Sequence, residues 1–506
     1  MSASVAPASA APDVAMRSPR GRWILAATVL GTGMAFLDST VVGIALPSIG
    51  RAFGGGVGLL QWVVTGYTLT LAAFLLLGGS LGDHFGRKRV FSIGVVWFAV
   101  SSALCGVAPT GVFLVVFRVI QGIGGALLTP GSLAIIQASF RTEDRAQAIG
   151  AWSGLGGIAT AAGPLVGGYL LAAGSWRLIF FINVPIAAVV LLMTARHVPE
   201  TFDPTSTGRV DVPGATLAVV FLAGLTYGLI EGPTRGWADP VVIASFVLAV
   251  AAAPTFLYVE SHRDHPMLPL GLFRSRQFSG ANGVTFLVYG ALSGALFLVP
   301  IELQEVAHYT PLASGLALLP VTVVMLLFSA RSGQLSARIG PRLQMSVGPV
   351  IVGAGLALLA RATTPGSYWV QVFPGTLVFA VGLAITVAPL TSTAMGAAPA
   401  EHSGIASAIN NTVARAAGLI AVAVLPVVAG LSGVAGLAAH ELSSGFRTAV
   451  FISGVAAAAG GLLGALTIRN PARRATKAEE AAASVYSCGV GVPPARPAPL
   501  SPAPSR

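Results

Sequence analysis

Cysteine and lysine are both scarce in this sequence, and charged residues of every kind make up only 9% of its 506 positions. Two cysteines, Cys105 and Cys488, cannot build a disulfide framework, which excludes a small disulfide-stabilised scaffold. A soluble domain carries about 25% charged residues, so the low charge excludes an ordinary soluble enzyme. Disorder is excluded as well, because 54% of the residues are hydrophobic and they are spread along the whole length.

Apolar runs long enough to cross a membrane recur along the chain, since a spanning helix needs about 20 apolar residues. The first run is too long for the core of a signal peptide, so we expect an uncleaved first helix. The sequence predicts an all-α membrane protein with fourteen helices. They cover residues 22–47, 58–81, 90–108, 112–139, 147–173, 178–195, 212–230, 240–258, 277–301, 312–332, 344–361, 369–396, 404–431 and 447–468.

The basic residues indicate the orientation of these helices. Lys and Arg number 22 on the side of both termini and 5 on the opposite side. The excess of positive charge on cytoplasmic loops predicts that both termini lie in the cytoplasm. The net charge of +11 comes from short clusters between apolar runs and not from one polar face, so we expect no nucleic-acid partner.

An internal repeat divides the chain. Residues 79–87, after the second expected helix, recur as residues 333–342 after the tenth, with Ala337 in place of Asp83. Two related six-helix halves with an inserted helix pair account for fourteen helices. We therefore expect a cytoplasmic segment 1–21, an N-terminal bundle 22–196, a linker with the additional helices seven and eight at 197–258, a C-terminal bundle 259–468 and a disordered cytoplasmic tail 469–506.

Two arginines and one acid fall inside expected helices, where an unpaired charge is costly. Asp38 is the only acid well inside a helix of the N-terminal half, and Arg118 is the obvious cation to face it. The pair either moves protons or is a permanent structural pair. The alternative for Arg118 is a structural role, in which it bonds Gln121 or backbone carbonyls. Arg415 either lines the C-terminal side of a cavity or pairs with carbonyls.

Other candidate sites are less specific. Glu302 lies at the outer end of the ninth helix. It either attracts a cation that enters an outer vestibule or is an acid of an interfacial loop. Gly163 and Gly167 lie on one helix face beside Pro164, which suits close helix packing. The histidines lack metal-ligand spacing, so we expect no metal site. No phosphate-binding loop motif occurs, which excludes ATP-driven transport by this chain alone.

These segments resemble the major facilitator superfamily, and within it the fourteen-helix drug:proton antiporter branch. The loop signature after the second helix is matched by Gly79, Asp83, Gly86 and Arg87, and the helix 4 signature by Arg118, Gln121, Gly122 and Gly124. The helix 5 antiporter signature is matched by Gly150, Gly163, Pro164, Gly167 and Gly168, with Ala159 where the family usually has glycine. Residues 37–47 are similar to the branch's helix 1 motif, with Gly43 where asparagine is common. Arginine far exceeds lysine, as in actinobacterial sequences.

The resemblance implies a multi-pass plasma-membrane exporter, not an enzyme, that exchanges protons for an amphipathic drug or antibiotic. It implies that Asp83 helps latch the cytoplasmic side of the two halves, and that Asp38 and Arg118 couple the proton. It also implies that the helix 5 face packs against the other half. Gln121, Glu302 and Arg415 are possible cavity or vestibule residues. We expect a monomer without a cofactor, driven by the proton gradient, whose role is either resistance or export of a self-made metabolite. The alternatives are a nutrient:proton symporter and a non-transporting membrane receptor.

Overall fold

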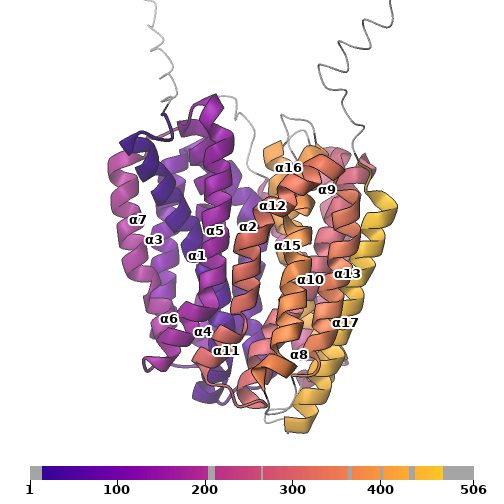
Figure 1. The fold of residues 1–506 in the computed structure, drawn as a ribbon. Helices are drawn as coiled ribbons and strands as arrows, with labels where there is room; N and C mark the ends of the chain where they lie inside the picture. The colour runs from indigo at the N-terminus through magenta and orange to yellow at the C-terminus, as the bar shows by residue number, and fades with distance from the viewer. Residues whose placement is uncertain are drawn as a thin grey trace, which may run out of the picture. The chain divides into compact units, whose positions relative to one another are not determined.

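A computed structural model describes residues 14–202, 211–263, 266–362, 367–398, 403–431 and 439–470. The first thirteen residues and the tail beyond residue 470, which was expected to be disordered, lie outside the described residues. Residues up to Arg469 form one compact unit, drawn in Figure 1. Its described part contains fourteen helices long and apolar enough to cross a membrane, which confirms the expected all-α membrane fold.

The helices follow one another with short connections. The N-terminal half consists of α1 (Pro19–Phe53), α2 (Val57–Phe85), α3 (Arg87–Gly106), α4 (Gly111–Ser139), α5 (Thr142–Ala172), α6 (Leu178–Phe181) and α7 (Asn183–His197). The middle pair is α8 (Val212–Arg235) and α9 (Pro240–His262). The C-terminal half consists of η1 (Leu270–Arg274), α10 (Arg276–Glu305), α11 (Pro311–Ala317), α12 (Leu319–Ile339), α13 (Arg342–Leu359), α14 (Tyr368–Gln371), α15 (Phe373–Gly396), α16 (Ser403–Val428) and α17 (Ala439–Thr467).

Several helices extend a few residues beyond the predicted ranges, and two of these differences are instructive. Helix α1 continues through Pro47 to Phe53 and ends only where Gly54 takes a left-handed conformation (φ 63°). A proline is tolerated inside a spanning helix when neighbouring groups satisfy the freed backbone. Helix α17 begins at Ala439 instead of residue 447, so the prediction missed its polar first two turns.

The repeated loop has the same geometry in both halves. Gly86 ends α2 with a φ of 103°, and Gly340 ends α12 with a φ of 84°. Their N–H groups donate to the carbonyl oxygens of Gly82 (3.1 Å) and Ser336 (2.9 Å). Positive φ favours glycine because a side chain would clash there. The spacing of glycines in the repeat is therefore set by two equivalent turns.

The two halves are joined at one end of the bundle. We call the end at which α1 begins and α17 ends the terminal end, and the opposite one, where α6 and α11 lie, the far end (Figure 1). Gln61 of α2 donates to the carbonyl oxygens of Val422 (2.8 Å) and Ala423 (3.2 Å) of α16. Gln304 of α10 donates to the carbonyl oxygen of Ile44 of α1 (2.9 Å). These bonds close the far end.

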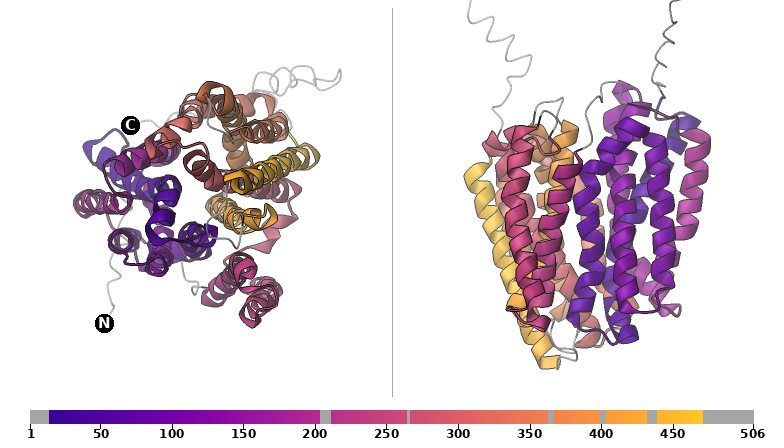
Figure 2. Two further views of the ribbon diagram at one scale, coloured as in Figure 1. Left: turned by 90° about the horizontal axis from the view of Figure 1, so that it is seen from below. Right: turned by 180° about the vertical axis from the view of Figure 1, so that it is seen from behind.

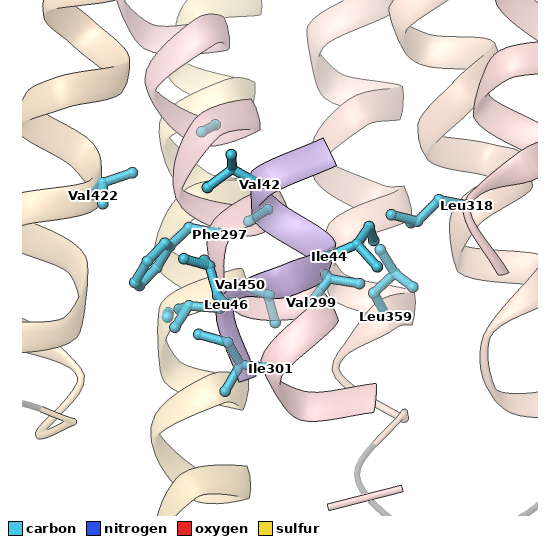
Figure 3. Packing of buried hydrophobic residues seen from close by; sticks show 14 of the residues in the cluster. Val42, Ile44, Leu46, Phe297, Val299, Ile301, Leu318, Leu359, Val422 and Val450 are labelled. Carbon is cyan, nitrogen blue, oxygen red and sulfur yellow. The ribbon is translucent and has the colours of Figure 1, made fainter. Parts of the chain in front are cut away.

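The apolar core follows the same division. Toward the far end, one cluster combines Val42, Ile44 and Leu46 of α1 with Phe297 and Val299 of α10 (Figure 3). At the terminal end the clusters separate: one is confined to the N-terminal half and another to the C-terminal half. The bundle is thus packed across its halves at the far end and within each half at the terminal end.

The middle pair lies at the edge of the bundle, as the view from below in Figure 2 shows. Helices α8 and α9 pack on each other, and α8 also contacts α2 and α16. Only 33% and 22% of their apolar windows are buried, against 61% for α1. Their remaining apolar surface faces the bilayer.

Candidate functional site

The centre of the N-terminal half holds a buried ion pair. Arg118 of α4 donates from Nη1 to Oδ2 of Asp38 of α1 at 2.5 Å, and both side chains are at most 1% exposed. Oδ1 of Asp38 accepts from Nε2 of Gln121 (3.0 Å) and from Nδ2 of Asn183 (3.2 Å). The carboxylate thus receives three donors, which satisfy an acid buried away from water.

Arg118 is equally well satisfied. Its Nε donates to the carbonyl oxygen of Val63 (3.1 Å), and its Nη1 also donates to Oε1 of Gln121 (2.9 Å). The guanidinium lies over the ring of Tyr67 at 4.2 Å from the centroid, a cation–π contact. The structure brings Asp38, Arg118 and Gln121 together inside one half. Gln121 is fully buried there and lines no exposed cavity.

Sequence reasoning missed Asn183 and Ser102. Asn183 begins α7 and donates to Asp38 and to Oγ of Ser102 (3.0 Å), whose hydroxyl in turn donates to the carbonyl oxygen of Phe180 (2.8 Å). The break between α6 and α7 leaves Asn183 at the start of a helix, aimed at the charge pair. An amide within the apolar run 178–195 was the available signal, because buried polar groups in membranes need partners.

The glycines of α5 face two different partners. A Cβ at Gly163 would collide with the side chain of Thr40 in α1, and one at Gly167 would lie 3.2 Å from Val41. A Cβ at Gly168 would instead lie 2.8 Å from the Cα of Leu312 in α11. The expectation that Gly163 packs against the other half is therefore wrong. Adjacent helix positions are about 100° apart, so Gly163 and Gly167 face α1 while Gly168 faces α11.

Two further members of the helix 5 signature behave differently. The carbonyl oxygen of Pro164 approaches Gly315 of α11, so this residue belongs to the contact between halves. A Cβ at Gly150 would meet nothing within 4 Å, and the same holds at Gly154 and Gly157. The terminal half of α5 thus presents a glycine face to open space in this conformation.

The loop after α2 contains a local ion pair. Asp83 binds Arg87 four residues later, at 2.8 Å. The backbone N–H groups of Lys88 and Arg89 donate to Glu200, at 3.0 and 3.2 Å. Glu200, and not Asp83, therefore caps the start of α3. A Cβ added at Gly79 would lie 3.6 Å from the Cβ of Pro130 in α4, which is an ordinary packing contact.

The remaining candidates lie in the C-terminal half. Glu302 is inside α10 and 1% exposed, and its Oε1 accepts from the hydroxyl of Ser443 (2.6 Å), so the interpretation as a loop acid is wrong. It presents no carboxylate to an open vestibule here. Arg415 is partly exposed at the middle of α16. Among the described residues no group of three or more His, Cys, Asp or Glu could hold a metal ion.

Comparison with known proteins places this geometry in a family. The model of the Major Facilitator Superfamily matches residues 28–422. The chain belongs to the Major Facilitator Superfamily. With fourteen apolar helices, it is a multi-pass protein of the plasma membrane.

Named relatives are similar over most of the chain. The multidrug resistance protein Stp of Mycobacterium tuberculosis is 37% identical, over 76% of this chain and 71% of its own length. The methylenomycin A resistance protein of Bacillus subtilis is 35% identical, over 82% and 89%. The tetracenomycin C resistance and export protein of Streptomyces glaucescens is 36% identical, over 81% and 76%.

Solved structures share the fold. A bacterial homologue of the human lysosomal transporter Spinster, in an inward-facing and unoccupied conformation, superposes with a TM-score of 0.63 at 18% identity. The match covers 90% of this chain and 100% of that one. The xylose transporter XylE of E. coli gives a TM-score of 0.58 at 17% identity, over 91% of this chain and 99% of its own.

Proposed function

We propose that the chain is a proton-coupled antiporter that exports drugs or antibiotics across the plasma membrane by alternating access. The observation that carries the proposal is the ion pair of Asp38 and Arg118, buried in the core of a transporter fold. A buried carboxylate deprived of its cation is strongly destabilised, and taking up a proton removes its charge. Movement of α1 against α4 would therefore couple a conformational change to proton binding.

Alternating access is supported by the packing of the halves. They are joined at the far end through Gln61 and Gln304, and each half has its own core at the terminal end. With the termini in the cytoplasm, as the charge bias predicts, this conformation is open to the inside. Substrate then enters from the cytoplasm, and the opposite state requires separation of the far-end contacts.

The printed names of the relatives support the cargo and the direction. Three of them are resistance proteins, for several drugs, methylenomycin A and tetracenomycin C, and one is also an export protein. The chain would serve either resistance or export of a self-made metabolite. Transport of this kind needs no covalent chemistry and no cofactor. The proposed partners are an amphipathic small molecule, protons and the lipid bilayer, with a monomer as the working unit.

The test is gradient-driven transport in inverted membrane vesicles, into which exported compounds accumulate. Tetracenomycin C, methylenomycin A and puromycin are the probes, with vesicles carrying Asp38→Asn as the control. We expect accumulation of at least one probe that collapses when an uncoupler removes the proton gradient. Gradient-driven movement only out of the vesicles would indicate a symporter, and no gradient-dependent flux would indicate a receptor; either result overturns the proposal.

A further inference from the structure

Arg415 is a cation near the middle of a spanning helix, and no ion pair to it is found among the described residues. It lies about halfway along α16, which runs from Ser403 to Val428. Its Nε is buried and has no hydrogen-bond partner among the described residues, and we find no ion pair for its guanidinium in that part of the chain. An unpaired charge at the bilayer centre costs about 2.5–3.5 kcal/mol even on insertion scales. A residue with such a cost is expected where its charge has a function.

The charges deep in the bundle do not cancel. Arg415 lies near the middle of α16, and Arg118 reaches the buried depth of Asp38 from the eighth residue of α4. Asp38 is the acid at that depth in the described chain. Asp38 is already bound to Arg118 and to two amides. One positive charge is therefore left over, and it belongs to Arg415.

Arg415 lies on a helix that contacts both halves. Helix α16 packs against α2 of the N-terminal half and against α10 of the C-terminal half. The next two residues of α16 contact different helices. Ala416 packs toward α2 and α8, whereas Ala417 lies against Gly290 of α10. Arg415 therefore belongs to a segment of α16 that packs on the N-terminal half on one side and on α10 on another.

The space beside this interface is open. Ser39 is exposed although most residues of α1 between Gly31 and Gly50 are buried, and a Cβ at Gly43 one turn later would meet nothing within 4 Å. Tyr67, which stacks on Arg118, also contacts α1 through its hydroxyl, which donates to the carbonyl oxygen of Ala35 (3.4 Å). Arg415 thus lies on a helix packed against α2, whose Tyr67 contacts both α1 and Arg118.

We propose that Arg415 binds an acidic group of the exported molecule, a carboxylate or a phenolate, so that the substrates are amphipathic organic anions. This inference rests on the proposed export function and names its substrate class. A guanidinium binds a carboxylate through two parallel N–H···O bonds, which are among the stronger hydrogen bonds in proteins. The anion supplies the charge that the chain itself lacks at this depth.

Binding of an anion at Arg415 would also influence the ion pair of Asp38 and Arg118. An organic anion cannot replace Arg118 as the partner of Asp38, because like charges repel. It can attract Arg118 away from Asp38 past Tyr67, whose ring lies against the Arg118 guanidinium. Loading of the anion would then favour proton uptake by Asp38.

The experiment measures transport of two probes of similar ring size and opposite charge, anthracene carboxylate and aminomethylanthracene, in inverted vesicles with an imposed proton gradient. We compare the wild type with Arg415→Gln and Arg415→Lys. The control is Arg361→Gln, which removes an exposed arginine after α13. Binding of both probes to the purified protein is measured in a buffer free of chloride and again with added chloride.

We expect the carboxylate probe to be accumulated by the wild type and to bind about tenfold or more weakly to Arg415→Gln, the loss typical of one or two charged hydrogen bonds. Arg415→Lys should recover part of the binding, and Arg361→Gln should leave it unchanged. The amine probe should be insensitive to Arg415→Gln.

Three results overturn the inference. The first is accumulation of the amine probe but not of the carboxylate, which leaves the export function standing. The second is equal weakening of both probes in Arg415→Gln and Arg415→Lys, which marks a structural arginine. The third is complete displacement of the carboxylate by millimolar chloride, which marks an inorganic anion site. Failure of the wild type to move either probe or any antibiotic under a gradient instead overturns the export function itself.

Discussion

Asp38 and Arg118 are joined at 2.5 Å across two helices, in a position where neither side chain is more than 1% exposed. Each also bonds Gln121, so that a single amide lies against both charges. A buried pair of this kind offsets its desolvation only while both partners stay in place. Any movement of α4 that takes Arg118 away from α1 would leave the Asp38 carboxylate buried without its cation, which is what the proposed coupling requires.

The first prediction concerns this acid. Asp38→Asn keeps the size of the side chain and its contacts with Gln121 and Asn183, but it cannot exchange a proton. We expect it to abolish substrate-induced proton release from the purified protein while leaving expression and membrane insertion intact. Asp38→Glu should retain part of the release, because a titratable carboxyl remains. Release is measured with a pH dye in weakly buffered detergent solution.

The competing explanation is a permanent structural pair. In that case removal of both charges, by Asp38→Asn with Arg118→Gln, restores a neutral and satisfied core. That double variant should then regain gradient-driven export. We expect it to insert normally and to remain inactive in transport, and uphill pumping by it would contradict coupling through Asp38.

The second prediction concerns the packing of α5 on α1. A methyl group at Gly163 would collide with Thr40, whose hydroxyl donates to the carbonyl oxygen of Thr160 (3.1 Å). Overpacking of this kind costs about 1–3 kcal/mol. Gly163→Ala should lower the thermal unfolding temperature of the purified protein and reduce export. Gly157→Ala, on the same helix but facing open space, is the matched control and should change neither.

The third prediction separates two acids near the junction of α2 and α3, Asp83 in the last turn of α2 and Glu200 after α7. Glu200 accepts the first N–H groups of α3, so Glu200→Ala should destabilise the protein by about 1 kcal/mol, the usual value of a lost helix cap. Asp83 forms a half-exposed ion pair with Arg87, and such pairs contribute about 0–1 kcal/mol. If Asp83 latches the halves in another conformation, Asp83→Asn should lower export at nearly unchanged stability. Equal export by Asp83→Asn and wild type, at equal expression, contradicts the latch.

The sequence was sufficient for the helices because each carries its own signal. A run of about 20 apolar residues must form a helix inside a bilayer, where no water satisfies the backbone. Two glycines of the repeat, Gly86 and Gly340, then mark equivalent turns. The errors at Pro47 and Ala439 came from using proline and polarity as stop signals, although neither ends a helix that neighbours support.

The site was only partly predictable, since partners across helices leave no pattern along the chain. Asp38 and Arg118 were predicted as a pair because each was the isolated charge of its region. Asn183 was missed because its role depends on the break between α6 and α7. The partner of Gly163 was assigned to the wrong half, because periodicity gives the face of a helix but not its neighbour. Glu200 was missed because it caps a helix more than a hundred residues earlier.

The last prediction tests alternating access through the contact between α5 and α11. Gly168 lies against Leu312, with 2.8 Å from an added Cβ to the Leu312 Cα, so α5 and α11 must move slightly apart to admit two cysteines, which are then within reach of a disulfide. Cys105 is buried and free, and a Cys488→Ser background removes the other native thiol. Oxidation of Gly168→Cys with Leu312→Cys should hold the far end closed.

We expect the oxidised protein to bind substrate but not to transport it, and a reducing agent should restore transport. Each single-cysteine variant is the control for the substitution itself. The cross-link should form fastest without a gradient, when the far end is closed as in this structure, and more slowly when an imposed gradient and substrate populate the opposite state. Full transport by a completely cross-linked protein would mean that the far end does not open, and it would exclude a mechanism in which the halves separate between α5 and α11.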